Sequence, residues 1–183
     1  MSNDRINVNQ PHDGASVNIE NQHVNLNETK SRVEPTDVPW NVPLSDTTNF
    51  ISREEQLDDI HEKLFINDSV PIAIHGTGGI GKTELAIQYA LKYKKSYEGG
   101  ICFFNARGEN LATNILGFAR SYFDIDPPKE SPINNKLDFY WSRWPKGKVL
   151  IIYDDVDNFD RIKEYFPPVD HFKLLITTRL KFG

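Results

Sequence analysis

Four short, almost continuously apolar runs recur along the chain after its first forty residues. They occupy residues 70–74, 101–104, 149–153 and 174–177. Unbroken apolar runs of this length are typical of strands that are buried on both faces. The segments between them carry apolar residues at helical spacing. Strands that alternate with helices predict an α/β domain whose parallel sheet is covered by helices on both sides.

The intervening helices are predicted from apolar spacing and from signals at their ends. They are expected over residues 53–65, from 82 onward, over 111–122, from about 132 and over 158–166. Ser52 followed by Glu55 forms a capping-box pattern at the start of the first helix. Ser131 is expected to cap the fourth helix, with Pro132 in its first turn. The apolar stripe of that helix is expected to run from Ile133 to Trp144, to include Trp141 and to serve packing.

The first 38 residues differ in composition from the rest. Asn, Gln, Asp, Glu and Ser dominate there, Phe, Trp and Tyr are absent, and apolar residues come in isolated pairs. Such a segment cannot bury enough surface to offset the entropy lost on ordering it. We predict a disordered Asn-rich leader and a proline linker over residues 1–42, and one domain over 43–183. The alternation of Ile6 and Val8 with polar residues leaves open a segment that assembles as cross-β through Asn ladders.

Composition and net charge restrict the partners and the cellular compartment that we expect for this domain. The chain has 183 residues, 21 Lys and Arg against 26 Asp and Glu, and a formal net charge of −5. This balance argues against nucleic acid as the main partner, because duplex binding needs a basic surface. No apolar run approaches the roughly 20 residues that cross a bilayer, so no membrane contact is expected. The single Cys102 excludes a disulfide framework and fits a buried residue of a reducing, cytoplasmic setting.

The strongest chemical signal is a glycine-rich segment between the first predicted strand and the helix from residue 82. It satisfies the pattern G-x-x-x-x-G-K-[ST] with Gly76, Thr77, Gly78, Gly79, Ile80, Gly81, Lys82 and Thr83. Glycines let backbone N–H groups approach phosphates, and the helix N-terminus favours an anion. Lys82 is expected on the β- and γ-phosphates and the Thr83 hydroxyl on Mg²⁺. The alternative is a glycine-rich turn without a ligand, which would leave Lys82 beside the positive end of a helix.

Charged residues follow two other predicted strands. Asp154 and Asp155 end the third strand, where Asp154 is expected to hold Mg²⁺ through water and Asp155 to orient or activate an attacking water. Arg179 follows the fourth strand and is expected to reach a γ-phosphate. A solvated acidic turn and a surface arginine paired with an acid are the alternatives. His75 is expected to end the first strand and not to act as a base. Together these features predict a P-loop NTPase with a three-layer αβα sandwich.

These residues, in this order, resemble the NB-ARC class of signal-transduction ATPases with numerous domains (STAND). The resemblance covers about residues 43–183. It rests on four segments: 50–54 (Phe-Ile-Ser-Arg-Glu), 76–83, 150–155 and 177–179 (Thr-Thr-Arg). More narrowly, residues 99–107 and 173–180 resemble bacterial, especially cyanobacterial, members in which tetratricopeptide repeats follow the ATPase.

The resemblance implies a switch that binds ADP or ATP with Mg²⁺, hydrolyses ATP slowly and self-associates in the full-length protein under a downstream repeat sensor. It places Phe50, Ile51 and Arg53 at the adenine, and it implies the strand order 5-1-4-3-2. Because the sequence stops after the fourth predicted strand, we interpret the domain as incomplete at its C-terminus. The first strand would then have an unpaired edge, and nucleotide binding would be weak without the missing side of the pocket.

Two other classes of function stay open at this point. The first is a conventional P-loop enzyme, either a motor ATPase or a small-molecule kinase. A kinase would need an arginine-rich lid, and residues 158–171 offer only Arg161 and Lys163. A motor would need an arginine finger, for which Arg120, Arg143 and Arg161 are candidates. The second class is a non-catalytic scaffold that retains ADP.

Overall fold

The computed structural model describes residues 38–45, 53–66, 71–168 and 171–180. The four strands are β1 (Ile72–His75), β2 (Ile101–Asn105), β3 (Val149–Val156) and β4 (Phe172–Thr178). The α-helices are α1 (Glu54–Ile66), α2 (Lys82–Lys92), α3 (Leu111–Phe123), α4 (Ile133–Trp141) and α5 (Phe159–Ile162), and two 3₁₀ turns are η1 (Lys94–Ser96) and η2 (Lys163–Tyr165). The predicted alternation of strands and helices is confirmed.

The strands form one parallel sheet in the order β1-β4-β3-β2. This order agrees with the 1-4-3-2 part of the expected arrangement. In the described residues β1 pairs with β4 only and lies at one edge. His75 lies opposite Thr178, and Asn105 lies opposite Asp154. Because the strands are parallel, their carboxyl ends meet at one edge of the sheet, where α/β proteins bind ligands.

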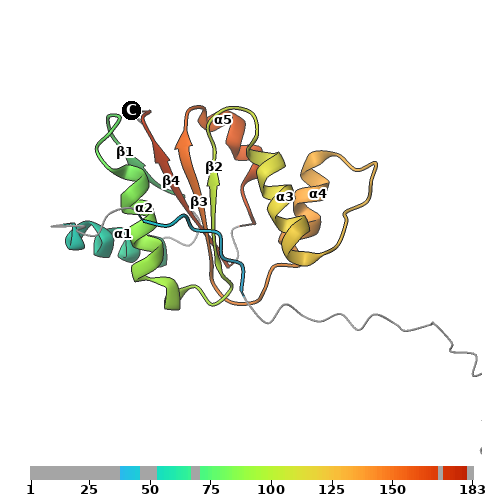
Figure 1. Ribbon diagram of the computed structural model, residues 1–183, viewed down its shortest axis with the longest axis horizontal. Coiled ribbons are helices and arrows are strands. Elements are labelled where there is room, and N and C mark those ends of the chain that lie inside the picture. Colours follow the sequence, from blue (N-terminus) through green and yellow to red (C-terminus); the bar gives the residue numbers. More distant parts are fainter. Residues whose placement is uncertain (1–37, 46–52, 67–70, 169–170, 181–183) are drawn as a thin grey trace, which may run out of the picture. The chain divides into compact units, whose positions relative to one another are not determined.

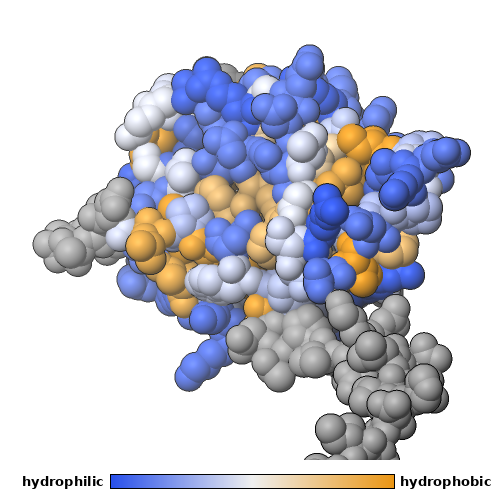
Figure 2. All heavy atoms as spheres, turned by 45° about the vertical axis from the view of Figure 1, so that its right-hand side comes forward, coloured by the Kyte–Doolittle hydropathy of each residue, from blue (hydrophilic) through white to orange (hydrophobic). Residues whose placement is uncertain are grey.

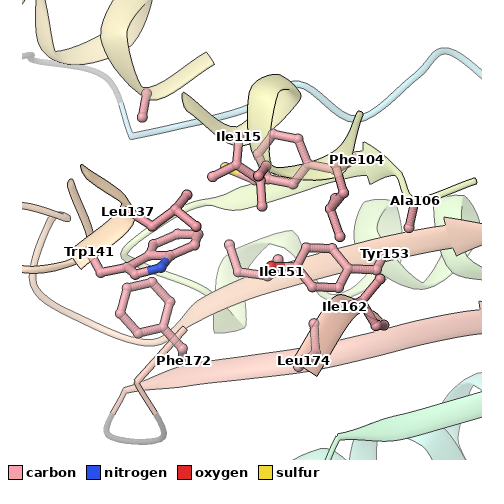
Figure 3. Close-up of a cluster of buried hydrophobic side chains, with 14 of the residues drawn as sticks. Phe104, Ala106, Ile115, Leu137, Trp141, Ile151, Tyr153, Ile162, Phe172 and Leu174 are labelled. Atoms are coloured by element: carbon pink, nitrogen blue, oxygen red, sulfur yellow. The ribbon is translucent and has the colours of Figure 1, made fainter. Parts of the chain in front are cut away.

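Helices cover both faces of the sheet (Figure 1): α1 and α2 lie on one side, and α3 and α4 on the other. Alternate side chains of β3 enter two separate cores. Ile151 and Tyr153 join the cluster that contains Leu137 and Trp141 (Figure 3). Leu150 and Ile152 belong to the second cluster, with residues of α1 and α2. Both faces of the strand are therefore apolar, which explains its unbroken apolar sequence.

The fourth helix differs from the prediction at both ends. It begins at Ile133 with Pro132 as its N-cap, and no side chain provides a capping hydrogen bond. The prediction that Ser131 caps this helix was wrong, because Pro132 has the extended backbone (φ −53°, ψ 158°) of the cap position and places Ser131 outside the helix. Trp144 lies beyond the end of α4, yet it is buried beside Trp141, as expected of a packing residue. Ser52 lies outside the described residues, so its capping role stays a prediction.

Cys102 is fully buried in the cluster that contains Leu137 and Trp141, as predicted. Burial in apolar surroundings raises the pKa of its thiol, because the thiolate would lose its hydration. The side chain therefore behaves as a small apolar residue. None of the helices in the described part of the chain combines the length and the apolar character that crossing a bilayer requires.

Residues 38–45 lie along the outer edge of β2, and we call this segment the edge strap. The Pro39 carbonyl accepts a hydrogen bond from the Ile101 N–H at 2.9 Å. The Asn41 side chain then pairs with the backbone of Phe103: its Oδ1 accepts from the N–H at 2.7 Å and its Nδ2 donates to the carbonyl at 3.0 Å. This amide takes the place of a neighbouring strand and covers an edge that would otherwise be open. Further along, the Ser45 hydroxyl donates to Glu84 of α2 at 2.6 Å.

We predict that Asn41→Ala lowers the free energy of unfolding by about 1–3 kcal/mol, because both backbone groups of Phe103 lose their partner. Urea unfolding followed by circular dichroism measures this change. Asn135→Ala, on the exposed side of α4, is the matched control and should stay within about 0.5 kcal/mol of the wild type. Equal stability of the Asn41→Ala variant and the wild type would contradict the role of this amide.

Candidate nucleotide site

The glycine-rich loop joins the end of β1 to the start of α2 at the carboxyl edge of the sheet. Gly81 is the N-cap of α2 and has φ 84°, a left-handed conformation that glycine adopts readily. Gly76 has φ 155°, a backbone conformation that residues with a side chain rarely adopt, and a Cβ atom there would lie 2.3 Å from Cδ1 of Ile80. The backbone therefore requires glycine at both positions and leads directly into the N-terminus of a helix. That geometry suits an anion, because the first N–H groups of a helix have no partners within it.

Lys82 turns its ammonium back over this loop. Its Nζ donates to the Gly76 carbonyl at 2.9 Å and to the Thr77 carbonyl at 2.8 Å. Only 8% of the residue is exposed. The positive charge therefore lies beside the glycine-rich loop, at the carboxyl end of β1.

Asp154 is the centre of a set of hydrogen bonds that joins three elements. The Thr83 hydroxyl of α2 donates to its two carboxylate oxygens at 2.9 and 3.1 Å. The Thr177 hydroxyl of β4 donates to Oδ1 at 2.5 Å and accepts from the Asp155 N–H at 2.9 Å. Only 6% of Asp154 is exposed. A buried carboxylate next to a hydroxyl supplies the hard oxygen ligands that Mg²⁺ prefers, so Asp154 and Thr83 fit the predicted metal site.

The structure brings Asp155 and Arg179 together as an ion pair. Nε of Arg179 lies 3.2 Å from Oδ1 of Asp155, and Nη1 of Arg107 lies 3.3 Å from Oδ2 of the same carboxylate. Asp155 has φ 56° and lies in the irregular part of β3 between Tyr153 and Val156. A left-handed backbone at a residue other than glycine is uncommon, and it turns this carboxylate toward the two arginines.

Of the three residues predicted to contact the adenine, Arg53 is the one that the structure describes. Its Nη2 donates to the Ile80 carbonyl at 2.9 Å, so the start of α1 is joined to the glycine-rich loop. Its guanidinium also borders Gly81, where a Cβ atom would lie 3.5 Å from Nη1. Phe50 and Ile51 lie outside the described residues, and their place at the adenine stays a prediction.

Two cavities adjoin the loop and share Lys82. One, of about 540 Å³, is lined by Gly78, Gly79 and Gly81 of the loop, by Thr83, Asp154, Asp155, Thr177 and Arg179, and by Asn105 with Pro43 and Leu44 of the edge strap. The other, of about 520 Å³, is lined by Arg53, Ile80 and the residues of β1. His75 is exposed at the end of β1 and lines this second cavity. Hydrophilic residues predominate at the top of Figure 2, the end at which the strands of Figure 1 terminate.

Sequence reasoning missed three features of this site. Thr177 appeared only as part of a motif, although its position at the carboxyl end of a buried strand indicated a place near Asp154. Arg107 lies two residues after β2, and the same signal of a charge at a strand end could have identified it. Leu44 of the edge strap lines the first cavity and is 93% exposed, and nothing in its sequence context indicated this position.

A parallel sheet in this strand order, with a G-x-x-x-x-G-K-[ST] loop between a strand and a helix, defines a P-loop nucleotide-binding domain. Residues 53–182 match the family model of the NB-ARC domain, and the chain belongs to the NB-ARC family.

Its relatives come from fungi, plants and bacteria. A "Nucleotide-binding leucine-rich repeat (NLR)-like protein" of Hyaloscypha variabilis is 29% identical over 68% of this chain and 13% of its own length. The "Probable disease resistance RPP8-like protein 2" of Arabidopsis thaliana is 25% identical over 91% of this chain and 18% of its own length. The "Regulatory protein AfsR" of Streptomyces griseus is 22% identical over 81% of this chain and 16% of its own length. The chain thus spans less than a fifth of each of these relatives.

We predict that Thr177→Val lowers the free energy of unfolding by about 1–3 kcal/mol, because valine keeps the shape but leaves the Asp155 N–H and the Asp154 carboxylate without this hydroxyl. Thr177→Ser keeps the hydroxyl and should lose no more than about 1 kcal/mol, the value of a buried methyl group. Thr113→Val makes the same substitution on the exposed side of α3, and it shows the effect of a threonine-to-valine change without the loss of these hydrogen bonds. A Thr177→Val protein as stable as the wild type in urea would show that the hydroxyl contributes nothing.

Proposed function

We propose that this chain is the nucleotide-binding part of a STAND-type switch, which binds ADP and ATP with Mg²⁺ and controls self-association and signalling. One observation carries the proposal: the Lys82 ammonium and the Thr83–Asp154 pair lie around one glycine-rich loop at the carboxyl edge of the sheet. An ammonium, a helix N-terminus and a carboxylate near a hydroxyl match the needs of a magnesium-bound polyphosphate.

The proposal assigns roles to the glycine-rich loop and to the charged and hydroxyl residues beside it. The backbone of residues 76–81 and Lys82 bind the phosphates, with Lys82 exchanging its loop carbonyls for phosphate oxygens. Thr83 and Asp154 would hold Mg²⁺, Asp154 through water. When bound, the ion would neutralise charge on the β- and γ-phosphates. Asp155 orients or activates the attacking water, and Arg179 contacts the γ-phosphate.

The adenine belongs on the other side of the loop. Arg53 lies there against the Ile80 carbonyl, beside the second cavity. Phe50 and Ile51 precede Arg53 in sequence and would add apolar contact. The second cavity also includes apolar residues of β1, which suits the face of a base.

The names of the relatives refer to disease resistance and to regulation, which favours a switch over a turnover enzyme. Slow Mg²⁺-dependent hydrolysis would then reset the switch. Self-association and a downstream repeat sensor belong to the full-length protein, and the narrower likeness to bacterial proteins with tetratricopeptide repeats is part of this proposal. So is the division into a leader and linker over residues 1–42 and the nucleotide-binding domain from residue 43.

We predict that Lys82→Ala weakens the binding of ADP and ATP at least tenfold, because charge-assisted hydrogen bonds contribute about 1.5–3 kcal/mol and 1.4 kcal/mol corresponds to tenfold. Titration calorimetry with and without Mg²⁺ measures these affinities. Asp154→Ala should remove the effect of Mg²⁺ on affinity. Lys95→Ala, an exposed residue of η1, is the charge-matched control. A wild-type chain that binds neither nucleotide, or a Lys82→Ala variant that binds as well as the wild type, would refute the proposal.

Turnover separates the switch from the conventional P-loop ATPase or kinase. We predict hydrolysis slower than about 1 s⁻¹, which lies at the low end of the usual range for enzymes, and a phosphate-release assay measures it. ADP recovered by chromatography from extracts of the freshly purified protein would further support the switch. Turnover well above this value would favour a motor ATPase instead.

A further inference from the structure

Arg107 is held at the carboxyl edge of the sheet by the turn that follows β2. Its backbone N–H donates to Oδ1 of Asn105 at 2.9 Å. On one side of it, the Ala106 N–H donates to the Asp154 carbonyl at 2.7 Å. On the other side, the Gly108 N–H donates to Oδ2 of Asp157 at 3.3 Å. Three consecutive amides thus attach this turn to β2 and to the end of β3, so the fold sets the position of the Arg107 backbone.

Two guanidinium groups share the Asp155 carboxylate. Arg107 contacts Oδ2 at 3.3 Å, and Arg179 contacts Oδ1 at 3.2 Å through Nε and Oδ2 at 3.5 Å through Nη2. The carboxylate is 23% exposed, whereas the arginine side chains are 61% and 55% exposed. Two cations and one anion leave one unit of positive charge in this cluster. One carboxylate therefore has more cationic partners than it needs for neutralisation.

Arg179 also lies beside the glycine-rich loop. A Cβ atom at Gly78 would be 3.7 Å from Nη1 of Arg179, so the guanidinium reaches the loop that precedes Lys82. A phosphate group bound in this loop would compete with Asp155 for Arg179. Arg107 does not line the cavity of the loop and has no such competitor among its described contacts. The two arginines are therefore equivalent in charge but different in their access to phosphate.

We propose that Arg107 is a positioning residue that holds the Asp155 carboxylate when Arg179 turns to the terminal phosphate, and that it thereby sets the preference for ATP over ADP. The inference rests on the proposed nucleotide binding and adds a residue to it. Without Arg107, Arg179 is the remaining guanidinium on Asp155, and its release to a γ-phosphate leaves that carboxylate unpaired. ADP lacks the γ-phosphate, so Arg179 stays paired with Asp155 when ADP is bound.

The expected effect is modest, because exposed ion pairs contribute little. We expect Arg107→Ala to lower the affinity for a non-hydrolysable ATP analogue about threefold to fivefold relative to ADP, with the affinity for ADP within twofold of the wild type. Arg107→Lys keeps the charge and should restore at least half of the change on a logarithmic scale. Arg120→Ala removes an equally exposed arginine from an ion pair with Asp126, away from the loop, and should leave the ratio unchanged.

Titration calorimetry of the 183-residue chain with Mg²⁺-ADP and with the Mg²⁺-bound ATP analogue measures these ratios, and circular dichroism confirms that each variant is folded. The same substitution in an Asp155→Asn background completes a double-mutant cycle. Arg107→Ala should have no effect on the ratio there, because the carboxylate charge is absent.

Several results would overturn the inference. An unchanged ratio in Arg107→Ala, an equal change in Arg120→Ala, or an effect that persists in the Asp155→Asn background would each do so while leaving nucleotide binding intact. A wild-type chain that binds neither nucleotide would instead refute the proposed function, and this inference with it. If Arg107→Ala does not fold, the comparison passes to Arg107→Lys and Arg107→Gln, and unchanged ratios in both would overturn the inference.

Discussion

The buried carboxylate of Asp154 is the constraint around which the carboxyl edge of the sheet is arranged. A carboxylate removed from water is costly unless hydrogen bonds or cations compensate for the lost hydration. Here hydroxyl groups from the first turn of α2 and from the end of β4 provide that compensation. The glycine-rich loop and two adjacent strands are thereby held in one geometry, and the Asp155 N–H is joined to the same set through Thr177. An oxygen-rich centre of this kind is suited to a divalent cation.

The three basic side chains near this centre each occupy a different place. Lys82 faces the loop, Arg179 lies between the loop and Asp155, and Arg107 approaches Asp155 from the turn after β2. The arrangement places cations where phosphates would bind and keeps a carboxylate beside them. Its rigidity comes from the two apolar cores on either side of the sheet and from the edge strap, which covers β2 and extends to α2 and the cavity.

Much of this organisation could be predicted because it depends on local pattern. The apolar runs identified all four strands of the described residues, and the loop motif and Asp154–Asp155 identified one edge of the sheet as the candidate site. What escaped prediction depends on contacts between segments distant in sequence. Asn41 pairs with Phe103, 62 residues away, and its sequence context resembles any proline-containing linker. Ser131 had the residue type of a cap, but the backbone of Pro132 moved the helix start beyond it.

The alternation of strands and helices, the parallel sheet and the residues of the glycine-rich loop can all be read from the chain alone, because periodicity and glycine content are properties of short segments. The folded structure was needed to find that Thr177 supports Asp154, that Asp155 faces two arginines and that the edge strap replaces a strand beside β2. These contacts depend on strand register and on a left-handed backbone at one aspartate, and both are set by the packing of the whole sheet.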